Sequence, residues 1–446
     1  MATPEFKHPL YKKHEDQLSR VSNIYSGVDS AKQYLQRYSQ EDEAEYNARK
    51  DIATLDNFVF RTVDDTKNII FRKPLDDTGI TNNDVILYSN KIDLTNTLNE
   101  FAKKALSNRI RDGFTFVLVD SVSYDSKTIT NKAQQTALGI RPYFVNILRQ
   151  NVLSWKTDDN GIYTQVVIQE PYTVELDYSI VTLTQLKIWT VRDGRVEIEI
   201  WRENKKEYEK VSVTQTALKT IPIVKIGDNN IPPLYDLAKI NITHMNRDSE
   251  VSNYARVGGA AFLAVFGAMD DGNAPKTLGI NNGMRFNDKS QSDVKWIEME
   301  GRNYEMLKSR ISYHEEQMNR ISSAFTMDQT QEKTAYQVGK ETMTGESKAI
   351  DYATQLEDGI NTALKLLDVY KTEGSYGDNI IEINKDYDSA ILSPEMVASY
   401  RLDYTSGIIS YEKLIEYLVA GEYFKSMTDE ELAVEKARLA DSGMGL

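Results

Sequence analysis

The chain contains no cysteine among its 446 residues. Disulfides, thiolate nucleophiles and cysteine-ligated zinc are therefore excluded together. Histidine is also scarce: the four are His8, His14, His244 and His314, and none has a second histidine at metal-ligand spacing. The sequence HEEQM at His314 is not the H-E-x-x-H pattern of zinc proteases. We therefore expect no metal and no cofactor, with His244 and His314 packed inside the protein or at an interface.

Long apolar runs and catalytic motifs are missing as well. A membrane span needs about 18 consecutive apolar residues, and no stretch of the sequence approaches this length. The first residues, MATPEFKHPLYKKHEDQ, lack the apolar core of a signal peptide. The segment 339–348, GKETMTGESK, has five residues between its glycines and carries Glu346 where a phosphate-binding loop needs lysine. We therefore expect a cytoplasmically made protein that is not an enzyme.

Positive charge is in short supply, since the formal net charge is -14 and the sequence pI is about 5.0. Affinity for nucleic acid comes mainly from Lys and Arg that release counterions from phosphates. The composition therefore argues against tight nucleic-acid binding, although the chain could border a nucleic acid without gripping it. Acidity that simply keeps a protein soluble is the commoner explanation.

The first half of the chain changes from helical to strand patterns. Apolar residues at helical spacing predict helices within 9–38 and 94–106, the second with Asp93 as N-cap. Short β-branched and aromatic runs then predict strands at 114–122, 162–169, 184–192 and 221–226. Asp193-Gly194 predicts a two-residue hairpin turn. The fold class expected is α+β with a mainly antiparallel sheet.

The stretch 231–341 is predicted to form two matched helices with a small excursion between them. Pro232 and Pro233 suit a first helical turn, and the returning helix has a heptad-like seam. Antiparallel packing is expected of Leu234, Leu237 and Ile240 in the first helix and of Tyr304, Leu307, Ile311, His314, Met318 and Ile321 in the second. Between them, glycine-rich residues 257–300 predict three short strands, too few residues for a core of their own.

The remainder is predicted to be mainly helical. Tyr352, Leu356, Ile360, Leu364 and Leu367 form an apolar stripe on a long helix. Its glycines at 339, 345 and 359 indicate kinks or a later helix start. A strand is expected at 379–383, then helices opening at Ser393-Pro394 and covering about 411–420, and a last helix with a Thr428/Glu431 capping box.

Taken in order, these segments resemble the portal proteins of tailed bacteriophages. The resemblance is in three parts: HPLYKKHEDQLSRVSNIYSG with the following stretch to FRKP, PPLYDLAKINITHMNRDSEVSNYARVGGAAFLAVFG with WIEMEG, and the helix, loop and helix ending in KTAYQVGKETMTGESKAI. Each motif is loose by itself, whereas their order and spacing make the combination more specific. The resemblance as a whole covers most of the chain, and these three parts carry it.

The resemblance implies a portal-like fold. It divides the chain into an N-terminal wing (1–231), a first stem helix (232–256), a clip (257–301), a second stem helix (302–325), a tunnel loop (326–335), a long helix with a return to the wing (336–393) and a helical C-terminal crown (394–446).

It also implies a function, namely a ring of usually twelve subunits at one capsid vertex. Such a ring conducts double-stranded DNA during packaging and ejection, and it contacts terminase, a head-tail adaptor, and the major capsid and scaffolding proteins. The protein would reside in the virion. The DNA channel would be lined by Gln329, Gln331, Lys333, Thr334 and Gln337, and partners would dock at Phe262, Val265, Phe266 and Trp296.

Two other classes remain open. An adaptor or minor capsid protein is one, although adaptors are usually shorter and lack the order stem, clip, stem. A hydrolase with an unrecognised Asp/Glu site is the other, because the 67 acidic residues could hide a catalytic pair. The stem seam is also open to two interpretations, as core within one chain or as contact between subunits.

Overall fold

The computed structural model describes most of the chain. The described residues are 4–39, 41–121, 138–204, 207–258, 262–266, 293–297, 302–323, 335–371, 375–385 and 394–420, with Phe325, Tyr387, Glu431 and Val434. They form two compact units, Met1–Asn384 and Lys385–Leu446. The first unit combines helices with antiparallel sheets, and the described part of the second unit is helical. The chain is therefore a mixed helix and sheet protein, which agrees with the α+β class expected from the sequence.

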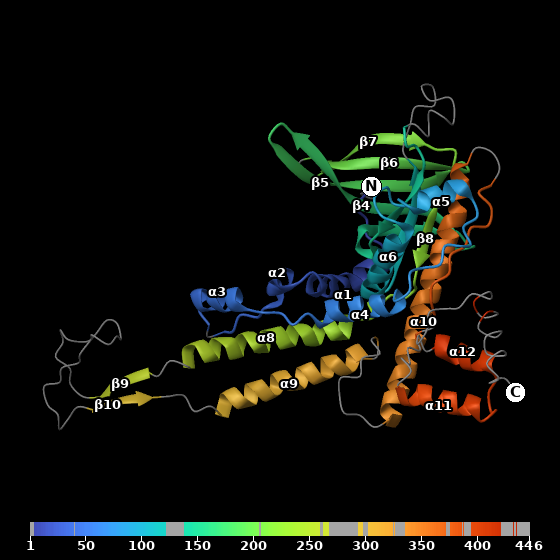
Figure 1. Cartoon of the computed structure of the whole chain (residues 1–446). Coiled ribbons are helices and arrows are strands. Elements are labelled where there is room, and N and C mark those ends of the chain that lie inside the picture. Colours follow the sequence, from blue (N-terminus) through green and yellow to red (C-terminus); the bar gives the residue numbers. More distant parts are fainter. Residues whose placement is uncertain are drawn as a thin grey trace. The chain divides into compact units, whose positions relative to one another are not determined.

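The first unit begins with a series of helices (Figure 1), and several of them start at a side-chain cap. The elements are α1 (Pro9–Tyr25), α2 (Val28–Ala31), η1 (Lys32–Tyr34), α3 (Glu43–Ile52), α4 (Phe58–Ile70), α5 (Asn83–Ser89) and α6 (Leu98–Asp112). Asp42 and Glu45 form a capping box on α3, and Asn57 caps α4 by accepting from the Phe60 N–H. Such caps satisfy backbone donors that a helix start leaves unpaired.

Asp93 does not cap α6, contrary to the prediction from its position. Its carboxylate accepts hydrogen bonds from the backbone N–H groups of Thr95 and Asn96, which forms a turn ahead of the helix. Thr97 is the N-cap, and it forms a capping box with Glu100. The helix therefore begins at Leu98, one turn later than predicted.

Two antiparallel sheets follow. Strand order is β2-β1-β8 in the smaller and β3-β4-β5-β6-β7 in the larger. Their bounds are β1 (Thr115–Ser121), β2 (Pro142–Ile147), β3 (Val152–Thr157), β4 (Tyr163–Leu176), β5 (Ser179–Arg192), β6 (Arg195–Asn204), β7 (Glu207–Gln215) and β8 (Ile223–Ile226), with η2 (Arg149–Asn151) between β2 and β3. The predicted Asp193-Gly194 turn joins β5 to β6, and both residues have positive φ, 50° and 73°.

The main core lies between these sheets. Phe116 on β1 and Trp189 on β5 are buried in one apolar cluster that also contains Ile223 of β8. On the opposite side of the larger sheet, Tyr11 of α1 packs with Leu186 in a second cluster. The larger sheet is therefore buried on both faces near its centre.

The long helix α10 (Ala335–Leu366) packs against β1 and β8, and η3 (Leu367–Tyr370), which follows it, packs against β2. Every residue of the predicted apolar stripe is buried, at 6% exposure for Tyr352 and 2% or less for the others. Gly359 lies where the helix approaches β8, because a Cβ there would be 2.4 Å from Cγ1 of Ile226. Close packing against β8 therefore explains why this position of α10 is a glycine, and the helix continues through it without interruption.

Gly359→Ala is accordingly expected to destabilise the protein by about 1–3 kcal/mol through overpacking, although alanine is the better helix former. Adding Ile226→Ala removes the two atoms that the new methyl would meet, and it should restore part of the loss. Urea unfolding of the two single variants and the double variant measures this coupling. Strictly additive effects would show that the two side chains do not compete for space.

The prediction of a strand at 379–383 is wrong. The segment makes one isolated antiparallel bridge, Asp76 with Glu382, and one further backbone hydrogen bond, from the Ile380 N–H to the Gly79 carbonyl. The N–H groups of Ile381 and Ile383 donate to the side chains of Asn361 and Glu357 instead. Asn379, 2% exposed, accepts from the N–H groups of Thr81 and Asn82. No neighbouring strand continues the pairing among the described residues, so a ladder does not form.

The second unit contains α11 (Pro394–Thr405) and α12 (Tyr411–Ala420), both close to the predicted bounds. Val397, Leu414 and Leu418 form its apolar core, and Tyr400 stacks on Tyr417. Ser393 and Thr428, the predicted caps, lie outside the described residues. None of the helices in the described parts of the chain combines the length and apolarity that crossing a membrane requires.

Candidate functional site: the α8–α9 hairpin

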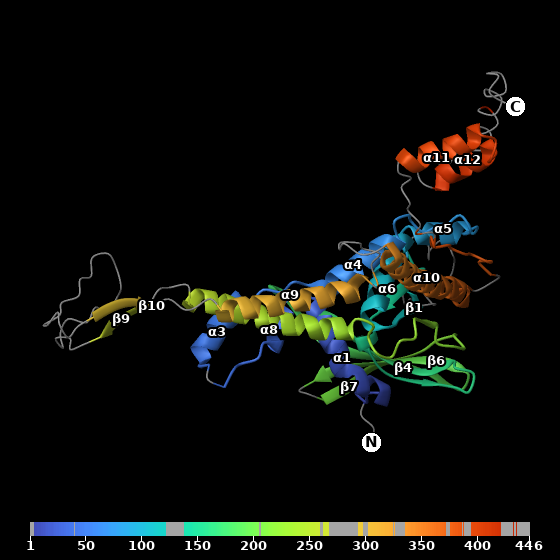
Figure 2. The same ribbon diagram turned by 90° about the horizontal axis from the view of Figure 1, so that it is seen from below.

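The stretch predicted to hold two matched helices forms a hairpin. Its helices are α8 (Tyr235–Gly258) and α9 (Arg302–Ser323), which lie side by side and antiparallel in both views (Figures 1 and 2). At 1.5 Å per residue they are roughly 36 and 33 Å long. Pro232 and Pro233 precede the first residue of α8 rather than entering its first turn.

A two-stranded antiparallel ribbon lies beyond the far ends of the two helices. It consists of β9 (Phe262–Phe266) and β10 (Asp293–Ile297), with Phe262 paired to Ile297 and Phe266 to Asp293. A ribbon of two strands is at best marginally stable alone in water. The third strand predicted in this region lies outside the described residues. The structure describes the backbone pairing of the predicted docking residues, Phe262, Val265, Phe266 and Trp296, and not their side chains.

The predicted seam is largely buried within a single chain. On α8 and just before it, Leu237 and Leu234 are fully buried, and on α9 Met318 is fully buried and Ile311 is 9% exposed. Four seam residues are only partly buried: Ile240, Tyr304, Leu307 and Ile321. Intrachain packing thus accounts for the centre of the seam, while its outer members retain accessible surface.

A second face of α8 is held by polar contacts to the N-terminal segment. Asn246 accepts from the Gln36 N–H at 2.8 Å and donates to the Tyr34 carbonyl at 3.2 Å. One turn further along α8, the hydroxyl of Ser249 accepts from Arg49 at 2.9 Å. These buried bonds fix α8 against α3 and the residues before it, which apolar packing alone would leave free to slide.

Arg49 is the centre of this contact and is 1% exposed. Its guanidinium donates to both carboxylate oxygens of Glu41, at 2.7 and 2.8 Å, and to the Gln36 carbonyl at 2.5 Å. Its planar group also lies over the rings of Tyr38 and Tyr46. Hydrogen bonds from Arg49 hold the pKa of Glu41 below its usual value.

The two hairpin histidines are both buried, as expected of packed side chains, with 4% exposure for His244 and 5% for His314. Burial lowers the pKa of His314, and the positive charges of Arg310 and Arg247 together with nearby His244 lower it further. His314 is therefore neutral at neutral pH. His244 contacts Glu315 of α9 through Nε2.

The near end of the hairpin is fixed to α4. The hydroxyl groups of Thr62 and Ser322 are 2.7 Å apart and both are buried. Thr66 donates to the Phe325 carbonyl at 3.3 Å. The last turn of α9 is thereby attached to the helical layer, and the ribbon end is the one far from this attachment.

The loop that leads into α8 is held by a buried arginine. Arg149 donates to the carbonyls of Asp112 at 2.7 Å, Asn229 at 3.3 Å and Asn230 at 2.6 Å. Burial lowers the pKa of Arg149 to about 10. Because a single guanidinium group donates to three backbone carbonyls, the loop that enters the hairpin is held in one conformation.

The predicted channel residues precede α10 or lie in its first turn. Gln329, Gln331, Lys333 and Thr334 lie outside the described residues, and Gln337 is on the first turn of α10 with its side chain also outside them. Exposed apolar surface is instead found on α9, where Met306 is 65% and Tyr313 is 47% exposed. These two residues are seven apart and therefore share a face of the helix.

Comparison with known proteins finds a matching family model over the region that contains the hairpin and α10. Residues 233–371 match a family model described as a domain of unknown function, DUF4055. This match covers less than half of the chain and runs from the approach to α8 to the end of η3. No curated protein matches the chain.

Two solved structures are similar at low identity. One is the neck of an empty GTA particle computed with C6 symmetry, 12% identical, with TM-score 0.40 over 80% of this chain and 88% of that chain. The other is the neck of a native GTA particle computed with C12 symmetry, 11% identical, with TM-score 0.37 over 81% and 89%. Scores of this size establish no common fold, so the proposal below rests on the chain's own sequence and geometry.

Proposed function

We propose that the chain is the portal subunit of a tailed bacteriophage. In this role, usually twelve copies form a ring at one capsid vertex, pass double-stranded DNA, and dock terminase and the head-tail connector. The observation that carries the proposal is the order of elements from Tyr235 to Leu366: helix, two-stranded ribbon, antiparallel helix and long helix. The order coincides with the sequence motifs that resemble portal proteins.

The physical properties of the hairpin support this proposal. Its near end is attached firmly to the helical layer, whereas its far end carries a ribbon too small to be stable by itself. Neighbouring copies or a docking protein would supply the missing partner. The exposed apolar face of α9 at Met306 and Tyr313 would then contact an adjacent subunit.

The charge of the chain supports a path along which DNA slides. Each copy carries a formal charge of -14, so a ring of copies is strongly acidic. Dense cationic contacts would retard a moving polyanion, because each phosphate contact adds affinity. The proposed channel residues remain those of the 326–335 loop with Gln337, and the proposed wing, stem, clip and crown remain as the resemblance divides them.

Negative-stain microscopy of the purified full chain tests the proposal. We expect rings with a central hole, and we expect Met306→Asp combined with Tyr313→Asp to abolish them, because the new charges would be buried at a contact. Leu87→Asp, at a position on α5 that is 64% exposed, is the matched control and should leave the rings intact. Thermal unfolding verifies that all variants are folded.

A persistent monomer at high concentration, together with particles whose vertex lacks the protein, would overturn the proposal. Protein found at the particle neck without ring formation would favour an adaptor or minor capsid protein instead. Rings that survive both α9 substitutions would remove this helix face from the subunit contact.

A further inference from the structure

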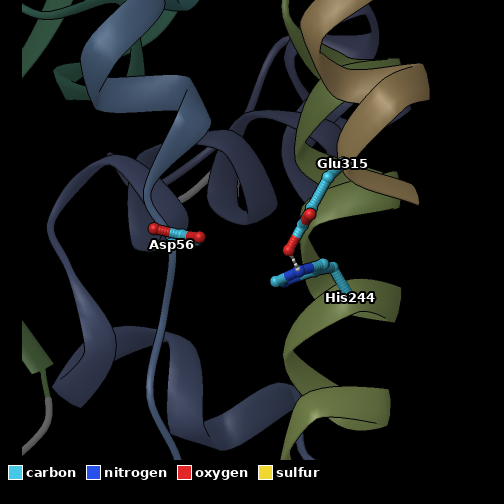
Figure 3. A group of neighbouring side chains, drawn as sticks. All are labelled: Asp56, His244 and Glu315. Atoms are coloured by element: carbon cyan, nitrogen blue, oxygen red, sulfur yellow. Dashed lines mark hydrogen bonds and ion pairs between the residues drawn. The ribbon is translucent and has the colours of Figure 1, made fainter. Parts of the chain in front are cut away.

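Three potential metal ligands from distant parts of the sequence meet beside the hairpin (Figure 3). Asp56 comes from the segment that enters α4, His244 from α8 and Glu315 from α9. One ligand atom of each residue lies within 4.8 Å of the other two. Sequence spacing gave no indication of the group, because no two of its members are neighbours in the chain.

The contact between His244 and Glu315 has the dimensions of two ligands that share an ion. Nε2 of His244 is 3.4 Å from Oε1 of Glu315. A charge-assisted hydrogen bond would be shorter, at about 2.7–2.9 Å. Two ligands on one tetrahedral zinc ion, with metal bonds of about 2.0–2.2 Å, are separated by about 3.4 Å.

Burial and charge also favour a cation at this place. The His244 side chain is buried, and its Nε2 faces the carboxylate of Glu315. In the tautomer that carries the proton on Nδ1, the Nε2 lone pair would face the carboxylate oxygen, and a cation between the two atoms would remove this repulsion. Neither Asp56 nor Glu315 is paired with Lys or Arg in the described parts of the chain. The adjacent cation, Arg247, is already bound to both carboxylate oxygens of Glu250 at 2.8 Å.

The backbone of Asp56 is held in position independently of any ion. Asn241, fully buried on α8, donates to the Asp56 carbonyl at 2.8 Å and accepts from the Phe58 N–H at 3.1 Å. It lies one helical turn before His244 and therefore fixes the approach of this segment to the histidine. The Asp56 side chain itself is exposed, and its carboxylate is one of the three ligand atoms within 4.8 Å of one another.

We propose that Asp56, His244 and Glu315 bind one divalent transition-metal ion of the zinc type, with water in the remaining position. An imidazole nitrogen with two carboxylates suits zinc or cobalt, whereas magnesium and calcium prefer oxygen ligands alone. The ion would connect the segment before α4 to both hairpin helices. This proposal does not depend on the proposed function, since the three residues belong to a single chain.

Metal titration of the full chain, stripped with a chelator and then dialysed, tests the proposal. Co²⁺ is followed by its visible absorption and Zn²⁺ by calorimetry, and we expect one ion per chain. Asp56→Asn and Glu315→Gln should each weaken binding at least about tenfold. Glu316→Gln removes the same charge from the neighbouring, exposed position and is expected to leave the affinity unchanged.

His244→Gln should abolish saturable binding, but it alters a buried side chain. The decisive variants are therefore Asp56→Asn and Glu315→Gln, whose side chains are exposed and partly exposed. Absence of saturable Co²⁺ and Zn²⁺ binding by the wild-type chain would overturn the site, as would affinities in both decisive variants within twofold of wild type. Full competition by Mg²⁺ would contradict the assignment of an imidazole ligand.

Discussion

Gly227→Ala is expected to lower the free energy of unfolding by about 2–5 kcal/mol. Gly227 has φ of +89°, a left-handed conformation that costs an L-residue roughly 1–2 kcal/mol. A Cβ there would also lie 2.0 Å from Nε and 2.1 Å from Cδ of Arg109. Relieving such an overlap in a packed interior adds about 1–3 kcal/mol.

Arg109 has no free direction in which to move away from the new methyl group. It is fully buried, and its Nε and Nη2 donate to Oε1 of Gln355 on α10 at 3.0 and 2.8 Å. Nη2 also donates to Oδ1 of Asn229, and the guanidinium lies over the Tyr352 ring. Displacing it would break contacts on the loop into α8 and on α10 together.

Gly194→Ala and Gly161→Ala are the matched controls. Both glycines have positive φ, +73° and +78°, and neither has an atom within 4 Å of the added Cβ. They should therefore show only the conformational cost of about 1–2 kcal/mol. Urea unfolding of the three variants measures the difference, and equal losses at Gly227 and Gly194 would show that Arg109 yields without cost.

Local sequence patterns were sufficient for elements whose cause is local. The Asp193-Gly194 turn and the stripe from Tyr352 to Leu367 were predicted because each depends on residues close in the chain. Asp93 was a wrong choice although Thr97 and Glu100, a better capping pair, were visible in the sequence. The predicted strand at 379–383 failed because strand formation depends on a partner, and here the partner provides one bridge, at Asp76.

The contacts around the hairpin could not be predicted in the same way. Its two helices were expected from periodicity, but Arg49 reaches Ser249 across 200 positions and Thr62 reaches Ser322 across 260. Polar pairs of this kind carry no periodic pattern. The group of Asp56, His244 and Glu315 was missed for the same reason, because metal-ligand spacing is recognisable only when ligands share a short segment.

Arg49→Met is expected to destabilise the protein by about 3–5 kcal/mol. The substitution preserves much of the side-chain volume but removes the counter-ion of Glu41, whose side chain is 9% exposed. An uncompensated carboxylate in a buried site has this cost. Arg20→Met, which breaks the exposed pair with Asp16, should cost less than about 1 kcal/mol and serves as the control.

A double variant and a pH series separate the charge from the packing. Adding Glu41→Gln to Arg49→Met removes the stranded charge and should recover at least about 1 kcal/mol. Because the pKa of Glu41 is lowered in the folded state, the pair stabilises the protein above the usual value of 4.5. This contribution is lost as the pH falls through the folded pKa, so wild type and Glu41→Gln should converge in acid.

The destabilisation caused by losing Arg49 should be confined to one part of the structure, because the guanidinium connects α3 to α8 through Ser249. We expect faster amide hydrogen exchange in α3 and in residues 34–41, with β1 protected as in the wild type. Uniformly faster exchange would indicate general destabilisation rather than detachment of this segment. Unchanged exchange in α3 would mean that the remaining contacts with α8, those of Asn246, of Tyr38 with Glu250 and of Thr54 with Asp248, hold this segment without Arg49. The assigned role of Arg49 would then be wrong.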